Sequence, residues 1–317
     1  MGIGLATNLQ KLLTDRLSTR NKARLLRKRS RARFVLHRLL GRDRANNSVA
    51  SEIAPIFVVG TNRSGSSLCT LMLSKHPDIE GIFQSTEVGH QIGADGHSFS
   101  GAEANHIWQG LTGLDYDLTK GESVLWGLPE SISKIYKNSV PAIEKRQLVD
   151  ELLCARSTNK IPLVMISHNI FRIRLIKELF PKSRFVYMTR DHRSFIKSGK
   201  HKWTTDQEIG VLGVDGHIDY PHIGLHWLLI NSIALYDLKK YAPADHIRVN
   251  LQDLQREESV RNSTINRVID FLGLDQMGSS DGVFDDAFMF AEPQDAQEIN
   301  VLSELVYNLF DYESELA

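Results

Sequence analysis

The sequence predicts an α/β fold in three layers, with a central parallel sheet flanked by helices. Short apolar runs at residues 56–59, 163–166 and 184–188 have the length and composition of buried strands. A helical pattern of apolar residues follows each of these runs. Strands that alternate with helices in this way form βαβ units, whose strands lie parallel in one sheet.

The remaining elements extend this pattern toward the C-terminus. Proline ends the first helix at His76-Pro77, because a proline cannot continue a helix. Residues 91–130 and 203–219 are expected to be irregular. In chain order, the expected elements are a strand at 56–59, a helix around 68–73, a return to the sheet edge and a loop over 79–87, a strand at 163–166, a helix over 171–180, a strand at 184–188, helices over 191–200 and 223–241, a strand over 246–251, and helices over 260–272 and around 301–309.

Charge divides the chain into two parts. The 317 residues are 42% hydrophobic, enough for a sizeable core, and the formal net charge is zero. Residues 1–50 nevertheless contain 13 Lys and Arg against 2 Asp and Glu, a net charge of +11, which leaves −11 for the rest. The sequence therefore predicts a basic leader over residues 1–50 and one folded domain over residues 51–317.

The leader has two interpretations that the sequence leaves open. Residues 11–44 interleave basic and apolar residues, as in a helix that lies on an anionic membrane surface, and a solvated leader would have the same composition. There is no apolar run of the roughly 18 to 20 residues that a membrane span needs, and no apolar signal core. Two cysteines cannot form a disulfide framework. We expect a cytoplasmic protein that can bind peripherally to a membrane through residues 11–44. We expect neither a metal site nor a nucleic-acid partner.

Residues 60–67, with the sequence GTNRSGSS, join the first strand to the first helix. Two glycines separated by four residues and followed by two hydroxyl residues have the spacing of a phosphate-binding loop. The N–H groups of such a loop and the positive end of the helix dipole attract a phosphate or sulfate. Ser66 stands where nucleotide triphosphatases have lysine, and Arg63 is the cation of the loop. The loop predicts a P-loop-like fold that binds an anion other than ordinary Mg-ATP.

A second anion site is expected at the same edge of the sheet. The strand at 184–188 delivers Arg190 to the carboxyl edge, where open α/β sheets bind their ligands. Ser198 follows eight residues later, about two turns into the helix that starts near Asp191. An arginine at a strand end commonly forms an ion pair. Arg190 and Ser198 therefore indicate an anion site only in combination with the loop. The same helix region carries a basic cluster at His192, Lys197, Lys200, His201 and Lys202. Such a cluster can steer an anionic ligand to the site, and the interpretation that we favour is a solvated helix face.

Together, these motifs resemble the sulfotransferase family that uses 3′-phosphoadenosine 5′-phosphosulfate (PAPS). The run RSGSS at residues 63–67 matches the family's loop [KR]-S-G-[ST]-[ST], which holds the 5′-phosphosulfate. Arg190 and Ser198 match the arginine and serine that bind the 3′-phosphate in the family. His76-Pro77 and residues 253–274 add similarity, so that the resemblance covers about residues 55–275.

The resemblance implies a sulfotransferase domain over residues 51–317, with PAPS as donor and adenosine 3′,5′-bisphosphate as product. Arg63 is expected to be catalytic as well, because negative charge builds on the bridging oxygen of the donor. Residues 251–254 read LQDL where many members have Y-E-D-[LM], and the R-K-G-x-x-G loop of cytosolic members is absent. The Arg-type loop is closer to Golgi-type and bacterial members. The donor-binding residues implied are Arg63, Ser64, Gly65, Ser66, Ser67, Arg190 and Ser198.

Two residues compete for the role of general base toward the acceptor. His168 lies 22 residues before Arg190, as the catalytic histidine of cytosolic members does. Glu87 lies in the loop where members with an Arg-type first loop carry a catalytic glutamate. The Arg-type loop favours Glu87 slightly, and both assignments stay open.

The acceptor is expected to be a hydroxyl group, on a carbohydrate or glycolipid rather than on a small phenol. Two other function classes compete with this one. A P-loop kinase or NTPase would need the lysine that Ser66 replaces, and an acidic residue at a strand end for Mg²⁺. A non-catalytic nucleotide-binding protein would dock on a membrane through the leader.

Overall fold

The computed structural model describes residues 52–61, 63–82, 142–156, 159–205 and 220–276. In this part of the chain, five strands form one parallel sheet in the order β2-β3-β1-β4-β5. The first strand is therefore central, with β3 and β4 as its neighbours. The strands are β1 (Ile56–Gly60), β2 (Ile79–Ile82), β3 (Ile161–Met165), β4 (Arg184–Thr189) and β5 (His246–Asn250).

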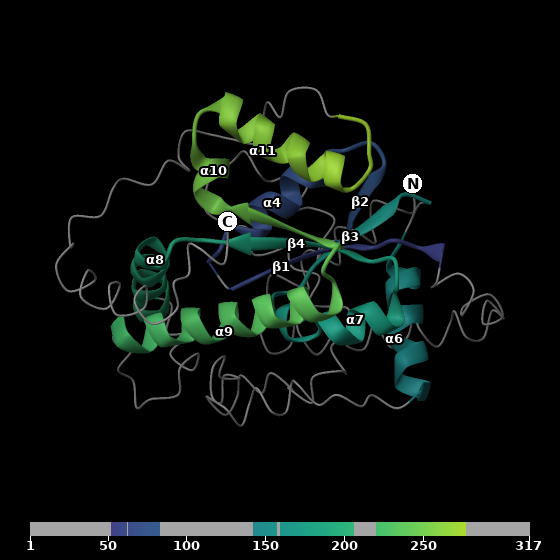
Figure 1. Cartoon of the computed structure of the whole chain (residues 1–317), viewed down its shortest axis with the longest axis horizontal. Helices are drawn as coiled ribbons and strands as arrows, with labels where there is room; N and C mark the ends of the chain where they lie inside the picture. Colours follow the sequence, from purple (N-terminus) through teal and green to yellow (C-terminus); the bar gives the residue numbers. More distant parts are fainter. Residues whose placement is uncertain (1–51, 62, 83–141, 157–158, 206–219, 277–317) are drawn as a thin grey trace, which may run out of the picture.

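Helices cover both faces of the sheet, as Figure 1 shows. One face carries α4 (Ser66–Leu73), α10 (Leu251–Gln255) and α11 (Glu258–Phe271), and the other carries α6 (Ala142–Ala155), α7 (Ile173–Leu179) and α9 (Tyr220–Tyr241). A 3₁₀-helix η3 (Ser167–Phe171) follows β3, and α8 (His192–Thr205) follows β4. The three layers confirm the predicted α/β architecture.

The alternation of side chains along β1 explains the two apolar layers. Successive side chains of a strand point to opposite faces of its sheet. Phe57 and Val59 accordingly pack with α6, α7 and α9, while Ile56 and Val58 pack with α4 and α11. All four side chains are at most 1% exposed, as expected for a central strand buried on both faces.

Cys69 belongs to the apolar layer between α4 and the sheet, where it is a small core residue. It is fully buried and forms no disulfide. Burial raises the pKa of its thiol to about 12, because the apolar surroundings disfavour the thiolate.

Several expected elements differ from those observed. The helix expected over residues 171–180 is α7, which is shorter at both ends, and the 3₁₀-helix η3 before it was not expected. Arg172, with φ −124° and ψ 15°, separates the two. Helices α6 and α10 were not predicted. The leader, the expected helix around 301–309 and most of the loop at 203–219 lie outside the described residues. Within the described part, no helix is long and apolar enough to cross a membrane.

Candidate active site

The phosphate-binding loop connects β1 to α4 at the carboxyl edge of the sheet. Two of its residues have left-handed backbone conformations, Arg63 (φ 69°) and Gly65 (φ 85°), and Gly65 is the N-cap of α4. No side chain caps this helix, and its first turn contains no acidic residue. The first N–H groups of α4 are therefore directed toward the loop with the positive end of the helix dipole, as an anion site requires.

Gly65 occupies a position that only glycine fits. A Cβ atom added there would lie 2.4 Å from Leu251 Cδ1, at the start of α10. The positive φ value also strains any residue that has a Cβ. Leu251 is 4% exposed, and it stands where many members of the resembling family have tyrosine. In this chain, the Leu251 side chain lies against Gly65 of the loop.

Ser64 adds an unsatisfied polar atom to the loop. Its side chain is fully buried, and its Oγ has no hydrogen-bond partner among the described residues. Burying a hydroxyl without a partner is costly, so such an atom indicates a position for a ligand. An anion with acceptor oxygens at the loop would give this hydroxyl a partner.

Arg63, Arg190 and Ser198 are brought together as the sequence predicts. Arg190 follows β4, and its Nη1 donates a hydrogen bond to the main-chain oxygen of Arg63 at 3.1 Å. Arg63 Nε donates in turn to Ser198 Oγ in α8, also at 3.1 Å. The two expected anion sites are thus one continuous group of residues. Asn62 and residues 83–141 and 206–219 lie outside the described residues.

The electrostatics of this group favour a bound anion. Arg190 is 8% exposed, and its pKa is lowered to about 10. Burial is the main cause, the charge of Arg63 adds to it, and the carboxylate of Asp191 opposes it. The Arg63 side chain is exposed and Arg190 is buried, and the positive charge of each disfavours that of the other. An anion bound close to both would relieve this repulsion.

Asp191 fixes the start of α8. Its Oδ1 accepts a hydrogen bond from the N–H of Ser194 at 2.9 Å, the geometry of an N-cap. Its Oδ2 accepts a second hydrogen bond from Gln252 Nε2 of α10. Asn250 caps α10 in the same way, by accepting from the N–H of Gln252 at 3.1 Å. The two helix starts beside the site are therefore linked by side chains.

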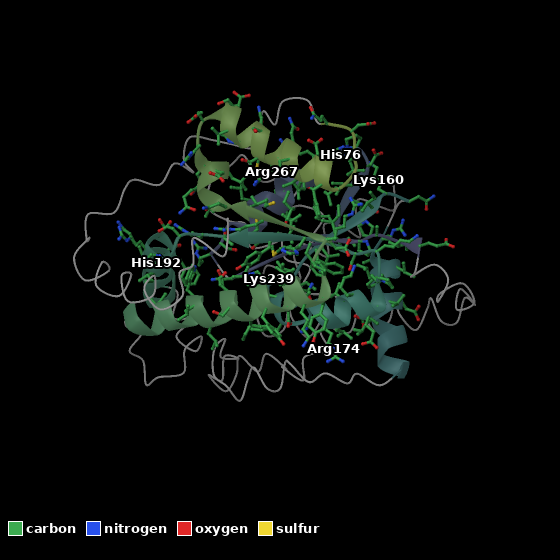
Figure 2. The ribbon with its side chains drawn as sticks, viewed as in Figure 1. His76, Lys160, Arg174, His192, Lys239 and Arg267 are labelled. Carbon is green, nitrogen blue, oxygen red and sulfur yellow. The ribbon has the colours of Figure 1, made fainter. Side chains whose placement is uncertain are left out.

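His192 contradicts the interpretation of the basic cluster as a solvated helix face. Its side chain is 4% exposed, and its ring lies 5.7 Å from the Trp227 ring at a tilt of 59°. Burial lowers the pKa of His192, with Asp191 opposing and Arg193 adding to the effect. Figure 2 shows His192 on α8, at the end of the molecule opposite His76 and Lys160. His192 is therefore a neutral, packed histidine at the carboxyl edge.

The structure leaves the choice of base open. His168 lies in η3, directly after β3, so its backbone is at the carboxyl edge of the sheet. Its side chain and the whole of Glu87 fall outside what the structure describes. Within the described part, no group of three or more His, Cys, Asp or Glu residues could hold a metal ion.

Trp227 is a site contact that the sequence did not reveal. Its indole Nε1 donates a hydrogen bond to the main-chain oxygen of Arg190 at 3.1 Å, from helix α9. The pattern of α9 marks Trp227 as an apolar-face residue, and no local pattern indicates that its N–H reaches Arg190. Only the tertiary structure brings the two residues together.

Comparison with known proteins identifies structures of similar fold. No curated protein sequence matches the chain significantly. Solved structures of similar fold include sulfotransferase STF9 from Mycobacterium avium, with 11% identity, a TM-score of 0.51, and coverage of 82% of this chain and 77% of that chain. Another is sulfotransferase STF1 from Mycobacterium tuberculosis H37Rv, with 13% identity, a TM-score of 0.48, and coverage of 81% and 76%.

A family model decides the assignment. Residues 55–277 match the model of the Sulfotransferase family, and this range contains the loop, Arg190 and Ser198. The match agrees with the resemblance found in the sequence motifs, and it sets aside the kinase and NTPase interpretation. The chain belongs to the sulfotransferase family.

Proposed function

We propose that this enzyme transfers the sulfuryl group of PAPS to a hydroxyl acceptor. The observation that carries the proposal is the junction of Arg63, Arg190 and Ser198, which joins an anion-binding loop to a second cationic position. A donor with a phosphosulfate at one end and a 3′-phosphate at the other needs two such positions. Mg-ATP has no 3′-phosphate, so the second position would have no partner in that ligand.

The residues present fit the two ends of the donor. Ser64, Gly65, Ser66 and Ser67 would hold the 5′-phosphosulfate with loop N–H groups and hydroxyls, and the unsatisfied Ser64 Oγ supports this assignment. Arg190 and Ser198 would hold the 3′-phosphate, because a guanidinium fork and a hydroxyl donor suit phosphate oxygens.

Sulfuryl transfer is an in-line displacement at sulfur. The acceptor oxygen forms a bond to sulfur while the bond from sulfur to the bridging oxygen breaks. The electron pair of that bond stays on the bridging oxygen, and adenosine 3′,5′-bisphosphate leaves. Arg63 would stabilise the developing charge, and Glu87 or His168 would accept the proton of the acceptor hydroxyl.

The acceptor class and the cellular setting belong to the same proposal. A carbohydrate or glycolipid hydroxyl is favoured by the Arg-type loop. The leader over residues 1–50 would bring a cytoplasmic enzyme to an anionic membrane surface, because its net charge of +11 attracts anionic lipid headgroups.

Ligand-dependent thermal stability tests the donor. We expect adenosine 3′,5′-bisphosphate to raise the melting temperature of the full chain, and Mg-ATP at equal concentration to raise it much less. A transfer assay with radiolabelled PAPS and a panel of sugars, glycolipids and phenols then tests the reaction. Stabilisation by Mg-ATP alone would overturn the proposed donor. Bisphosphate binding without transfer to any acceptor would favour a non-catalytic nucleotide-binding protein.

A further inference from the structure

Two buried hydrogen bonds tie helix α9 to the end of strand β4. Tyr187 Oη donates to Asn231 Oδ1 at 2.6 Å, and Trp227 Nε1 donates to the Arg190 carbonyl at 3.1 Å. Along the β4 segment, Tyr187 comes three residues before Arg190. Along α9 the partners come in the opposite order, with Trp227 four residues before Asn231. The strand and the helix are therefore fixed against each other at two points.

The polar pair lies in a mostly apolar layer between α9 and the sheet. Tyr187 and Asn231 are at most 1% exposed, and their neighbours in this layer include Phe185 and Ile230. Asn231 Nδ2 also donates to the Trp227 carbonyl at 2.7 Å, which fixes the side-chain amide so that its oxygen faces Tyr187. A phenylalanine and a leucine could fill the same space without any buried polar atom.

The second contact acts directly on Arg190. This residue lies between the end of β4 and the N-cap Asp191, where its carbonyl takes no part in either the sheet or the helix. The Trp227 indole holds that carbonyl, while Asp191 is held by Ser194 and Gln252. With both sides of the peptide fixed, the direction in which the Arg190 side chain leaves the backbone is fixed too.

We propose that Trp227, supported by the Tyr187–Asn231 hydrogen bond, is a positioning residue that aims Arg190 at the 3′-phosphate of the nucleotide. This inference rests on the proposed function, because it assigns Arg190 to the 3′-phosphate. Trp227 acts through the main chain of Arg190, to which its indole N–H donates. Its loss should therefore weaken recognition of the 3′-phosphate while the phosphosulfate loop stays intact.

The test compares two nucleotides that differ only in the 3′-phosphate. Affinities for adenosine 3′,5′-bisphosphate and adenosine 5′-monophosphate are measured by calorimetry on the full chain, and their ratio is the readout. In Trp227→Phe, which keeps a ring but loses the N–H, we expect the ratio to fall roughly fivefold to tenfold, as for the loss of one net hydrogen bond. The double variant Tyr187→Phe/Asn231→Leu should lower the ratio in the same direction, with apolar groups in place of both polar partners.

Leu238→Ala in the same helix is the matched control. Leu238 is fully buried in the same apolar layer, and its truncation destabilises α9 without touching Arg190. We expect this variant to melt at a lower temperature and to keep the wild-type ratio. An unchanged ratio in both Trp227→Phe and the double variant, or an equal loss of affinity for both nucleotides, would overturn the inference. A wild-type enzyme that does not prefer the bisphosphate would overturn the proposed function itself, which is a separate outcome.

Discussion

Arg63 Nε donates a hydrogen bond to Ser198 Oγ at 3.1 Å, joining residues that lie 135 positions apart in the sequence. Arg63 comes from the loop after β1, and Ser198 from the second turn of α8. The Arg63 main-chain oxygen accepts from Arg190 at the same time. One arginine thus connects the loop to both residues of the second anion position.

Removal of Arg63 should reduce turnover more than binding. In Arg63→Ala we expect kcat to fall about 10²- to 10³-fold, the usual effect of removing a group that stabilises transition-state charge. Initial rates with radiolabelled PAPS at saturating donor measure this effect. Lys182→Ala is the control, because Lys182 is an exposed cation before the amino end of β4 and should leave kcat unchanged. A full-rate Arg63→Ala enzyme would remove Arg63 from the catalytic group.

Substitution of Gly65 should destabilise both the loop and the fold. Gly65→Ala places a Cβ 2.4 Å from Leu251 and forces alanine into a left-handed conformation, so we expect a loss of roughly 2 kcal/mol or more in the free energy of unfolding. Urea denaturation measures this loss. Gly224→Ala is the control, because its Cβ would meet Ile196 at 3.5 Å, an ordinary contact, within α9. Adding Leu251→Ala to Gly65→Ala should recover only the part of the stability loss that comes from the steric clash. The part that comes from the left-handed backbone conformation should remain.

The general base can be assigned by two single substitutions. We expect Glu87→Gln to lower kcat by roughly 10²- to 10⁴-fold, and His168→Ala to keep most of its turnover. Binding of adenosine 3′,5′-bisphosphate, measured in parallel, checks that the donor site is intact in each variant. The opposite result would assign the role to His168, and near-normal turnover in both variants would exclude both residues.

The stability of the protein should fall on mild acidification because of His192. Burial lowers the pKa of His192 below its ordinary 6.5 in the folded chain, whereas the unfolded chain binds the proton near that value. Below about pH 6.5 the unfolded state therefore binds more protons, and the free energy of unfolding decreases by at most about 1.4 kcal/mol per pH unit. Urea denaturation between about pH 7.5 and pH 5.5 should show a smaller decrease in His192→Gln. Equal slopes in the two proteins would contradict this account.

Deletion of residues 1–45 tests the basic leader. We expect the full chain to sediment with vesicles that contain anionic lipid, and the deleted form to remain in solution, because the leader carries the excess positive charge. Vesicles of neutral lipid are the control, since they should bind neither form. Equal sedimentation of both forms with anionic vesicles would remove the leader from membrane contact.

The sequence predicted the sheet better than the helices on its faces. Buried strands such as Ile56–Gly60 and Arg184–Thr189 appear as continuous apolar runs, a signal that survives without tertiary context. Helix α10 has five residues, too few for a periodic pattern, and depends on the cap from Asn250. The break between η3 and α7 lies at the buried Arg172, inside a continuous helical pattern.

In the site, too, the sequence predicted the residues that belong to local motifs and did not predict the contacts that depend on tertiary structure. Arg63, Arg190 and Ser198 were predicted because their spacing along the chain is a local property of two motifs. The contacts of Leu251 with Gly65 and of Trp227 with Arg190 were not, because each joins elements distant in the sequence. Such contacts depend on how helices pack on the sheet, because Leu251 begins α10 and Trp227 belongs to α9.

The full burial of Cys69 determines how this residue responds to oxidants and alkylating reagents. These reagents attack the thiolate, and the Cys69 thiol, with a pKa of about 12, stays protonated and inaccessible while α4 rests on the sheet. Chemical modification of Cys69 must therefore wait until α4 leaves the sheet. Because α4 begins directly after Gly65, that opening also dismantles the phosphate-binding loop. Inactivation through this cysteine would be limited by the rate of local unfolding, and a bound nucleotide would slow it.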